Sequence, residues 1–259
     1  MRAIADDELA AEAQLAYDAG ELDRTRELAI RGLEKQPEDA ELLGLAARSS
    51  LELGLGDAVD HFRRLVALRP DDTGALLNLA HAVYASGDAD EAATLLAGVV
   101  ERDPDNLAAL RSLVEMHRRN GRTDAALDCA SQLSERDASD VLAALDVAEL
   151  SLEQGAHDKA RAAFARVREL DPDEEHRPFA YHGMIEVEIR RRRWRRALDL
   201  AIDATQEDRN SLTTALLAYI ATQLFGQGEE AAPTSEEIDE ALATERDAHR
   251  RLHVEARAL

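Results

Sequence analysis

The sequence contains few aromatic residues and a single cysteine. Only 3% of the 259 residues are aromatic although 45% are hydrophobic, so Leu, Ala and Val must form the core by close packing. The lone Cys129 excludes an internal disulfide. We expect it to be a structural thiol on the buried side of a helix, because no neighbouring residue indicates a redox role.

Long apolar runs and catalytic motifs are missing as well. No stretch approaches the ~18 apolar residues of a membrane span, and the first residues lack the basic and apolar regions of a signal peptide. No HExxH, CxxC, phosphate loop or nucleophile elbow occurs. His249 and His253 share a helical face, but no third metal ligand accompanies them. We therefore expect a cytoplasmic protein that is not an enzyme, with no metal, no cofactor and no catalytic residue.

The charge balance is strongly acidic. The chain has 53 acidic and 31 basic residues, a formal net charge of -22, and only Lys35 and Lys159 are lysines. Such a surface repels nucleic acid and anionic membranes in general. The composition resembles that of proteins from salt-loving archaea, although a GC-rich bacterium would also use Arg in place of Lys, so both origins stay open.

Glycine and proline recur at a steady interval of 33 or 34 residues. The glycines are Gly20, Gly54, Gly87, Gly121 and Gly155, and the prolines are Pro37, Pro70, Pro104 and Pro172, with Ala138 at the place of the missing one. Each glycine lies where one apolar stripe ends and the next begins, and each proline ends the second stripe. The pattern predicts an internal repeat of two short amphipathic helices.

The apolar positions carry a resemblance to the tetratricopeptide repeat (TPR) family. The third repeat matches the family pattern at Leu76, Leu79, Ala80, Val83, Ala92, Leu96 and Pro104, and the fifth matches it at Ala144, Val147, Ala148, Ala160, Phe164 and Pro172. The chain departs from the pattern where Ser50, His117 and Ser151 replace an aromatic residue, and no tryptophan opens a repeat. The resemblance implies an all-α, right-handed α-solenoid of antiparallel helix pairs.

We expect six TPR-like repeats in residues 1–209 and an extended C-terminal helix pair in residues 210–259. The repeats cover about 6–37, 38–70, 71–104, 105–138, 139–172 and 173–209. In the sixth, Pro178 should lie in the first helical turn, and either Gly183 or Ile185 takes the small-residue position. Thr234 and Glu237 form a predicted capping box before a final helix that runs to about residue 256. That helix caps the array, lies in its groove or pairs with a second chain as a homodimer.

The resemblance also implies a function, that of a non-catalytic scaffold that binds a peptide or partner protein in a concave groove. In the family the first helices of successive repeats line this groove. The matching candidates here mix apolar residues with both charges, and we expect about half of them to touch a partner: they are Arg48, Leu77, His81, Tyr84, Arg111, Glu115, Arg118, Leu145, Glu149 and Leu152.

A basic run forms the strongest local anomaly, and we call it the arginine corner. Its members are Arg190, Arg191, Arg192, Arg193, Trp194, Arg195 and Arg196. The corner could hold a phosphate, a nucleic-acid backbone or an acidic partner, which would make the protein a ligand- or nucleic-acid-responsive regulator. The alternative is a solvated turn whose arginines pair with Glu186, Glu188 and Asp199 while Trp194 packs. Because of the net charge, nucleic acid is the less favoured partner.

Overall fold

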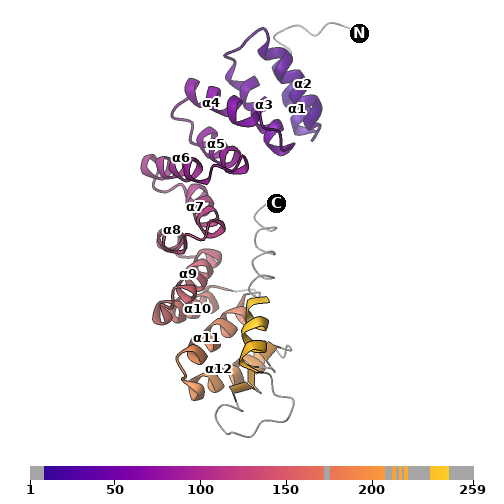
Figure 1. Cartoon of the computed structure of the whole chain (residues 1–259). Coiled ribbons are helices and arrows are strands. Elements are labelled where there is room, and N and C mark those ends of the chain that lie inside the picture. The colour runs from indigo at the N-terminus through magenta and orange to yellow at the C-terminus, as the bar shows by residue number, and fades with distance from the viewer. Residues whose placement is uncertain are drawn as a thin grey trace. The chain divides into compact units, whose positions relative to one another are not determined.

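The described residues of this computed structural model form an all-α helical repeat solenoid (Figure 1). The structure describes residues 9–171, 176–207, 212–213, 216–217, 219–220 and 234–244, and it assigns no strand within these ranges. The expected fold class is confirmed. No helix among these residues is long and apolar enough to cross a membrane. The cytoplasmic location stays a prediction.

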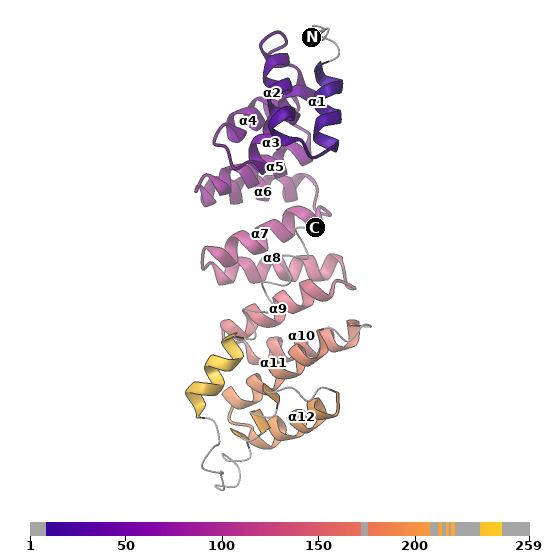
Figure 2. The same cartoon turned by 90° about the vertical axis from the view of Figure 1, so that its right-hand side faces the viewer.

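The helices fall into two compact units. Unit 1 is Met1–Cys129 and unit 2 is Ala130–Leu259, so the boundary lies within α8. Helices α1 to α8 are Leu9–Asp18, Leu22–Leu33, Ala40–Glu52, Ala58–Leu68, Thr73–Ala85, Ala89–Arg102, Leu107–Arg119 and Thr123–Arg136. Helices α9 to α12 are Val141–Glu153, His157–Leu170, Arg177–Arg190 and Trp194–Glu207. Within each unit a first, odd-numbered helix packs against the second helix that follows it, as Figure 2 shows for α5 and α6.

Glycine in the left-handed conformation ends the first helix of a pair, as the sequence predicts. Gly87 has φ of 99°, which costs a glycine little because it has no Cβ. The turn closes when the Gly87 N–H bonds the Tyr84 carbonyl at 3.0 Å and the Asp88 N–H bonds the Val83 carbonyl at 3.2 Å. Gly20, Gly54, Gly121 and Gly155 also have positive φ.

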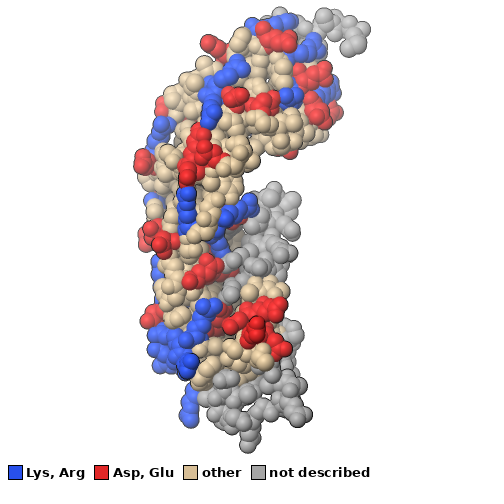
Figure 3. Space-filling view, in the orientation of Figure 1, with Lys and Arg blue, Asp and Glu red and all other residues tan. Residues whose placement is uncertain are grey.

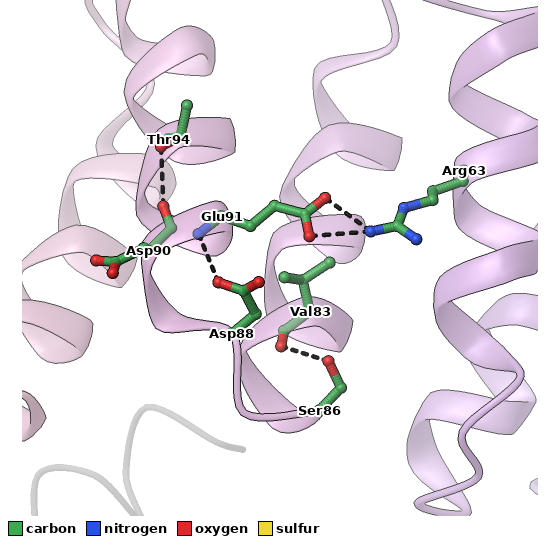
Figure 4. Close-up of polar contacts among 7 residues, drawn as sticks. All are labelled: Arg63, Val83, Ser86, Asp88, Asp90, Glu91 and Thr94. Carbon is green, nitrogen blue, oxygen red and sulfur yellow. Dashed lines mark hydrogen bonds and ion pairs between the residues drawn. The ribbon is translucent and has the colours of Figure 1, made fainter.

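Short polar side chains start many of the helices. The Asp88 carboxylate accepts a hydrogen bond from the Glu91 N–H at 2.9 Å at the start of α6, and Glu91 also pairs with Arg63 of α4 at 2.8 Å (Figure 4). Asp72 caps α5 in the same way through the Ala75 N–H. These bonds satisfy backbone donors that the first helical turn leaves without a partner.

The predicted apolar stripes form the cores of the two units. In unit 1, Leu76, Leu79, Ala80 and Val83 are buried together with Phe62. In unit 2, Phe164 of α10 is fully buried and its ring lies 6.2 Å from that of Phe179 of α11.

Cys129 is free and only half-buried, so the expectation of a buried thiol holds in part, and burial raises its pKa. The charge of Asp128 raises this pKa further, and a raised pKa disfavours the reactive thiolate.

Residues 235–244 form a helix that belongs to the core of unit 2. Thr234 and Glu237 exchange the two capping-box bonds that the sequence predicts, at 2.7 and 3.2 Å. Ile238 and Leu242 are 2% and 3% exposed within a cluster that also holds Tyr181 and Ile185 of α11, and the segment lies beside α11 in both views (Figures 1 and 2).

Several expectations lie outside the described residues. They include the end of repeat five at Pro172, the start of the C-terminal helix pair at residue 210, the helix beyond residue 244, and the pair His249 and His253. The proposed repeat boundaries and the choice among cap, groove and homodimer for the final helix stay predictions.

Candidate functional site

The first helices α3, α5 and α7 of unit 1 carry a set of half-buried side chains that we call the first-helix surface. These side chains belong to neither the core nor the fully exposed surface, so each has part of its area available to a partner. The set consists of the candidates that the sequence named in this unit: Arg48, Leu77, His81, Tyr84, Arg111, Glu115 and Arg118.

Contacts between successive first helices hold parts of this surface in place. The Arg48 guanidinium lies 4.7 Å from the centre of the Tyr17 ring of α1, a cation–π distance. The Tyr17 hydroxyl donates a hydrogen bond to Glu52 of α3 at 2.5 Å. Burial, and then this hydrogen bond to a carboxylate, raise the pKa of Tyr17, so the hydroxyl stays protonated.

A second contact of this kind joins α5 and α7. Nε2 of His81 lies 2.9 Å from Oγ of Ser112. Burial lowers the pKa of His81, so the imidazole is neutral at pH 7 and can either donate or accept this bond. Further along α7, Glu115 pairs with Arg119 at 2.6 Å. Leu77 and Tyr84 lie about one turn before and one turn after His81 on α5, and both pack partly on the core.

The partner-binding candidates named from the sequence do not include Tyr17 or Ser112. For Tyr17 a signal exists, because stepping back from Tyr84 by 33 residues gives Leu51 and by a further 34 gives Tyr17. These three residues occupy the same position in successive repeats. For Ser112 no composition signal exists, because its role depends on where the ring of His81 lies.

The three candidates in unit 2 are placed differently from those in unit 1. Leu145 is 4% exposed, and Glu149 and Leu152 are each 2% exposed. These α9 side chains therefore have almost no area open to a partner in this structure, and their role in partner binding stays a prediction. Helical periodicity identifies the stripe that faces the helix's own repeat, but it does not show whether the opposite side is covered.

Helix α11 repeats this burial and one of the polar contacts. All of its residues from Phe179 to Glu188 are buried. Nε2 of His182 lies 2.8 Å from Oγ1 of Thr213, with the same 31-residue separation as His81 and Ser112. Unit 1 thus presents its first helices in part, whereas unit 2 encloses them.

Most of the arginine corner is engaged in ion pairs. Arg190 pairs with Glu186 at 2.6 Å and Arg191 pairs with Asp158 of α10. Glu188 is fully buried and lies 3.1 Å from Arg161 and 3.9 Å from Arg193. The predicted pairing with Glu186 and Glu188 is thus confirmed, but no described ion pair reaches Asp199.

Trp194 packs at this turn, as expected if the arginine corner is a solvated turn. Its ring meets that of Tyr219 edge-on, with 6.0 Å between centres and 74° between planes. Three arginines remain, and we call Arg192, Arg195 and Arg196 the free arginines. Each is exposed and its side chain forms no hydrogen bond or ion pair with any described residue. Figure 3 shows blue side chains gathered over the α11–α12 turn.

Among the described residues, no group of three or more His, Cys, Asp or Glu side chains is placed to bind a metal ion. The candidate site consists of two regions, the first-helix surface of unit 1 and the free arginines of unit 2.

Comparisons with known proteins support the repeat family. Two tetratricopeptide repeat models match, one over residues 55–116 and one over residues 112–175. No curated protein matches the sequence.

Solved structures resemble the chain in fold, at identities too low to show more. A crystal structure of MamA is 17% identical with a TM-score of 0.59, and the match covers 65% of this chain and 94% of MamA. YrrB, described as a TPR protein with an unusual peptide-binding site, is 18% identical with a TM-score of 0.55 over 64% of this chain and 86% of its own. A tetratricopeptide repeat protein from Parabacteroides merdae is 18% identical with a TM-score of 0.59, and the match covers 92% of this chain and 97% of that one.

Proposed function

Because the chain belongs to the tetratricopeptide repeat family, we propose that it is a non-catalytic interaction scaffold that binds a peptide or partner protein on the first-helix surface of unit 1. One observation supports the choice of unit 1 over unit 2. The candidates on α3, α5 and α7 are half-buried, whereas those on α9 are enclosed. A side chain without accessible area contributes no new burial when a partner arrives.

The composition of the surface defines the kind of partner. Leu77 and Tyr84 offer apolar area that still contacts water, and Tyr84 adds a hydroxyl that can bond a partner. Arg48 of α3 and Arg111 and Glu115 of α7 add both charges from the first helices on either side of α5. Such a surface fits a partner segment with an apolar centre and charged flanks of both signs better than a purely acidic tail.

Replacing Leu77 and Tyr84 together with Asp tests this proposal. The change places two charges where a partner would bury apolar area, so capture should fall by about tenfold or more. The measurement uses the full-length protein on beads in extract of its own organism, with retained proteins quantified by mass spectrometry. The main interactor is then purified, and its affinity for both forms is measured by calorimetry.

The matched control replaces Leu55 and Leu68 with Asp. Both are 40% exposed residues of unit 1 that lie outside the first helices, and the change in charge is the same. The control should bind as wild type does, and circular dichroism should show equal helix content in all three forms. If the variant at Leu77 and Tyr84 retained as much of the interactor as the wild-type protein does, this surface would be rejected as the binding site.

A further inference from the structure

The free arginines are unusual because this chain offers so many possible ion-pair partners. It has 53 acidic residues for 31 basic ones. Arg190, Arg191 and Arg193 of the same turn all find a carboxylate. Arg192, Arg195 and Arg196 find none among the described residues, so three guanidinium groups within five residues keep their donors for a molecule from outside.

Arg192 also occupies a backbone conformation that its side chain disfavours. Its φ is 54°, and it is the one non-glycine residue of the described chain with positive φ. The Arg192 N–H bonds the Ile189 carbonyl and the Arg193 N–H bonds the Glu188 carbonyl, both at 2.8 Å, which is how the glycine turns close. At the corresponding place five other pairs have glycine, so Arg192 adds a cation at some cost in strain.

The first turn of α12 reverses the charge of the other second helices. Helices α2, α4, α6, α8 and α10 each have an acidic residue in the first turn, where it interacts well with the positive end of the helix. Helix α12 has none. It places Arg195 and Arg196 there instead, and Arg193 before it has no acceptor atom with which to cap the helix. The free N–H groups and the free arginines therefore create a positive field that an anion would relieve.

From these three features we propose that Arg192, Arg195 and Arg196, with the N-terminus of α12, form a docking site for a short acidic peptide segment of a partner protein. Guanidinium groups bind carboxylates through paired hydrogen bonds. The site lies in unit 2, apart from the first-helix surface, so it adds a second contact to the scaffold and can fail or succeed independently of the proposed function.

Charge around the site favours a short acidic segment over nucleic acid. Helix α12 continues with exposed Asp199 and Asp203, and the side chain of Asp158 is 87% exposed next to Arg191. A nucleic-acid strand carries regularly spaced charge along its length, so it would have to pass these carboxylates on a protein of net charge -22. A peptide can place a few Asp or Glu residues on the arginines and end there.

The binding experiment uses a short fluorescein-labelled peptide of alternating Glu and Asp and the full-length protein, followed by fluorescence anisotropy at about 0.05 M salt. Arg195→Glu with Arg196→Glu should weaken binding by about tenfold. The matched control, Arg31→Glu with Arg69→Glu, reverses two other exposed arginines that lie in unit 1, and it should keep the wild-type affinity.

Arg192→Gly separates binding from folding. Glycine relieves the left-handed backbone, so the thermal midpoint should rise while peptide affinity falls by about threefold. A binding loss in this more stable variant cannot come from unfolding. Unchanged affinity in Arg192→Gly would overturn the proposal.

Three further outcomes would also overturn it. They are no measurable binding of the peptide to the wild-type protein, an equal loss of affinity in the control pair, and tighter binding of a single-stranded oligonucleotide of the same length than of the peptide. The titration is repeated at two fixed concentrations of the labelled peptide. Equal affinities at both concentrations exclude self-association of the peptide.

Discussion

At the scale of single residues, Gly183 of α11 packs tightly against Phe164 of α10. A Cβ atom added at Gly183 would lie 2.3 Å from the Phe164 ring. The ring cannot move aside easily, because it is fully buried and packs against Phe179. Gly183 is therefore the residue of the sixth repeat that must be small, a choice between Gly183 and Ile185 that the sequence left open.

Gly183→Ala should destabilise the protein despite the better helix propensity of alanine. The propensity gain is about 1 kcal/mol, but forcing a methyl group into a filled core costs about 1–3 kcal/mol, so we expect a net loss of up to about 2 kcal/mol. Gly98→Ala in α6 is the control, because a Cβ there meets nothing within 4 Å, and it should be neutral or stabilising. Urea unfolding measures both. A more stable Gly183→Ala variant would show that the Phe164 ring relaxes.

At the scale of helices, capping side chains set where the first helices begin. Asp72 accepts the Ala75 N–H at 2.9 Å at the start of α5, while the exposed Asp71 beside it forms no hydrogen bond or ion pair with a described residue. Asp71 and Asp72 carry the same charge. Comparing variants of the two residues therefore separates the contribution of the capping bond from that of the charge.

Asp72→Ala should lower the free energy of unfolding by about 1 kcal/mol, because the helix N-terminus loses its acceptor. Asp71→Ala removes one negative charge from the same place and should change stability by less than about 0.5 kcal/mol. Chemical denaturation at one ionic strength compares them. Equal effects in the two variants would mean that charge, and not the capping bond, determines the change.

At the scale of the whole molecule, the net charge of -22 opposes folding. Exposed ion pairs such as Arg63 with Glu91 and Arg122 with Asp90 offset part of this repulsion, but each is of small value in water. Salt screens both contributions. Since carboxylates outnumber basic groups by far, the loss of repulsion should exceed the loss of these pairs.

The thermal midpoint should therefore rise between about 0.05 and 0.5 M NaCl, as measured by circular dichroism. The control replaces five exposed glutamates with Gln, which lowers the net charge from -22 to -17 and should reduce the slope with salt: Glu38, Glu41, Glu101, Glu135 and Glu169. A midpoint that falls with salt in the wild-type protein would show that ion pairs exceed repulsion.

The helix pairs could be predicted from the sequence because their causes are local. Gly87 ends a helix through its own backbone conformation, Asp72 caps one from within the first turn, and the stripe from Leu76 to Val83 depends only on the 3.6-residue period. Arg192 closes the same kind of turn without glycine, so the regular spacing of turn glycines does not continue to this turn.

The site could be predicted only in part, because exposure depends on residues far away in the chain. Leu77 and Leu145 hold the same place in their repeats, and so do Tyr84 and Leu152, yet the first of each pair is half-buried and the second is enclosed. The difference among the arginines has the same origin, since Arg191 reaches Asp158 in another repeat, while Arg195 reaches no carboxylate of a described residue. The sequence by itself determined where helices begin, end and face inward, because those properties are set within a few residues. The tertiary structure alone decided which outward faces remain accessible, because that depends on what packs over them.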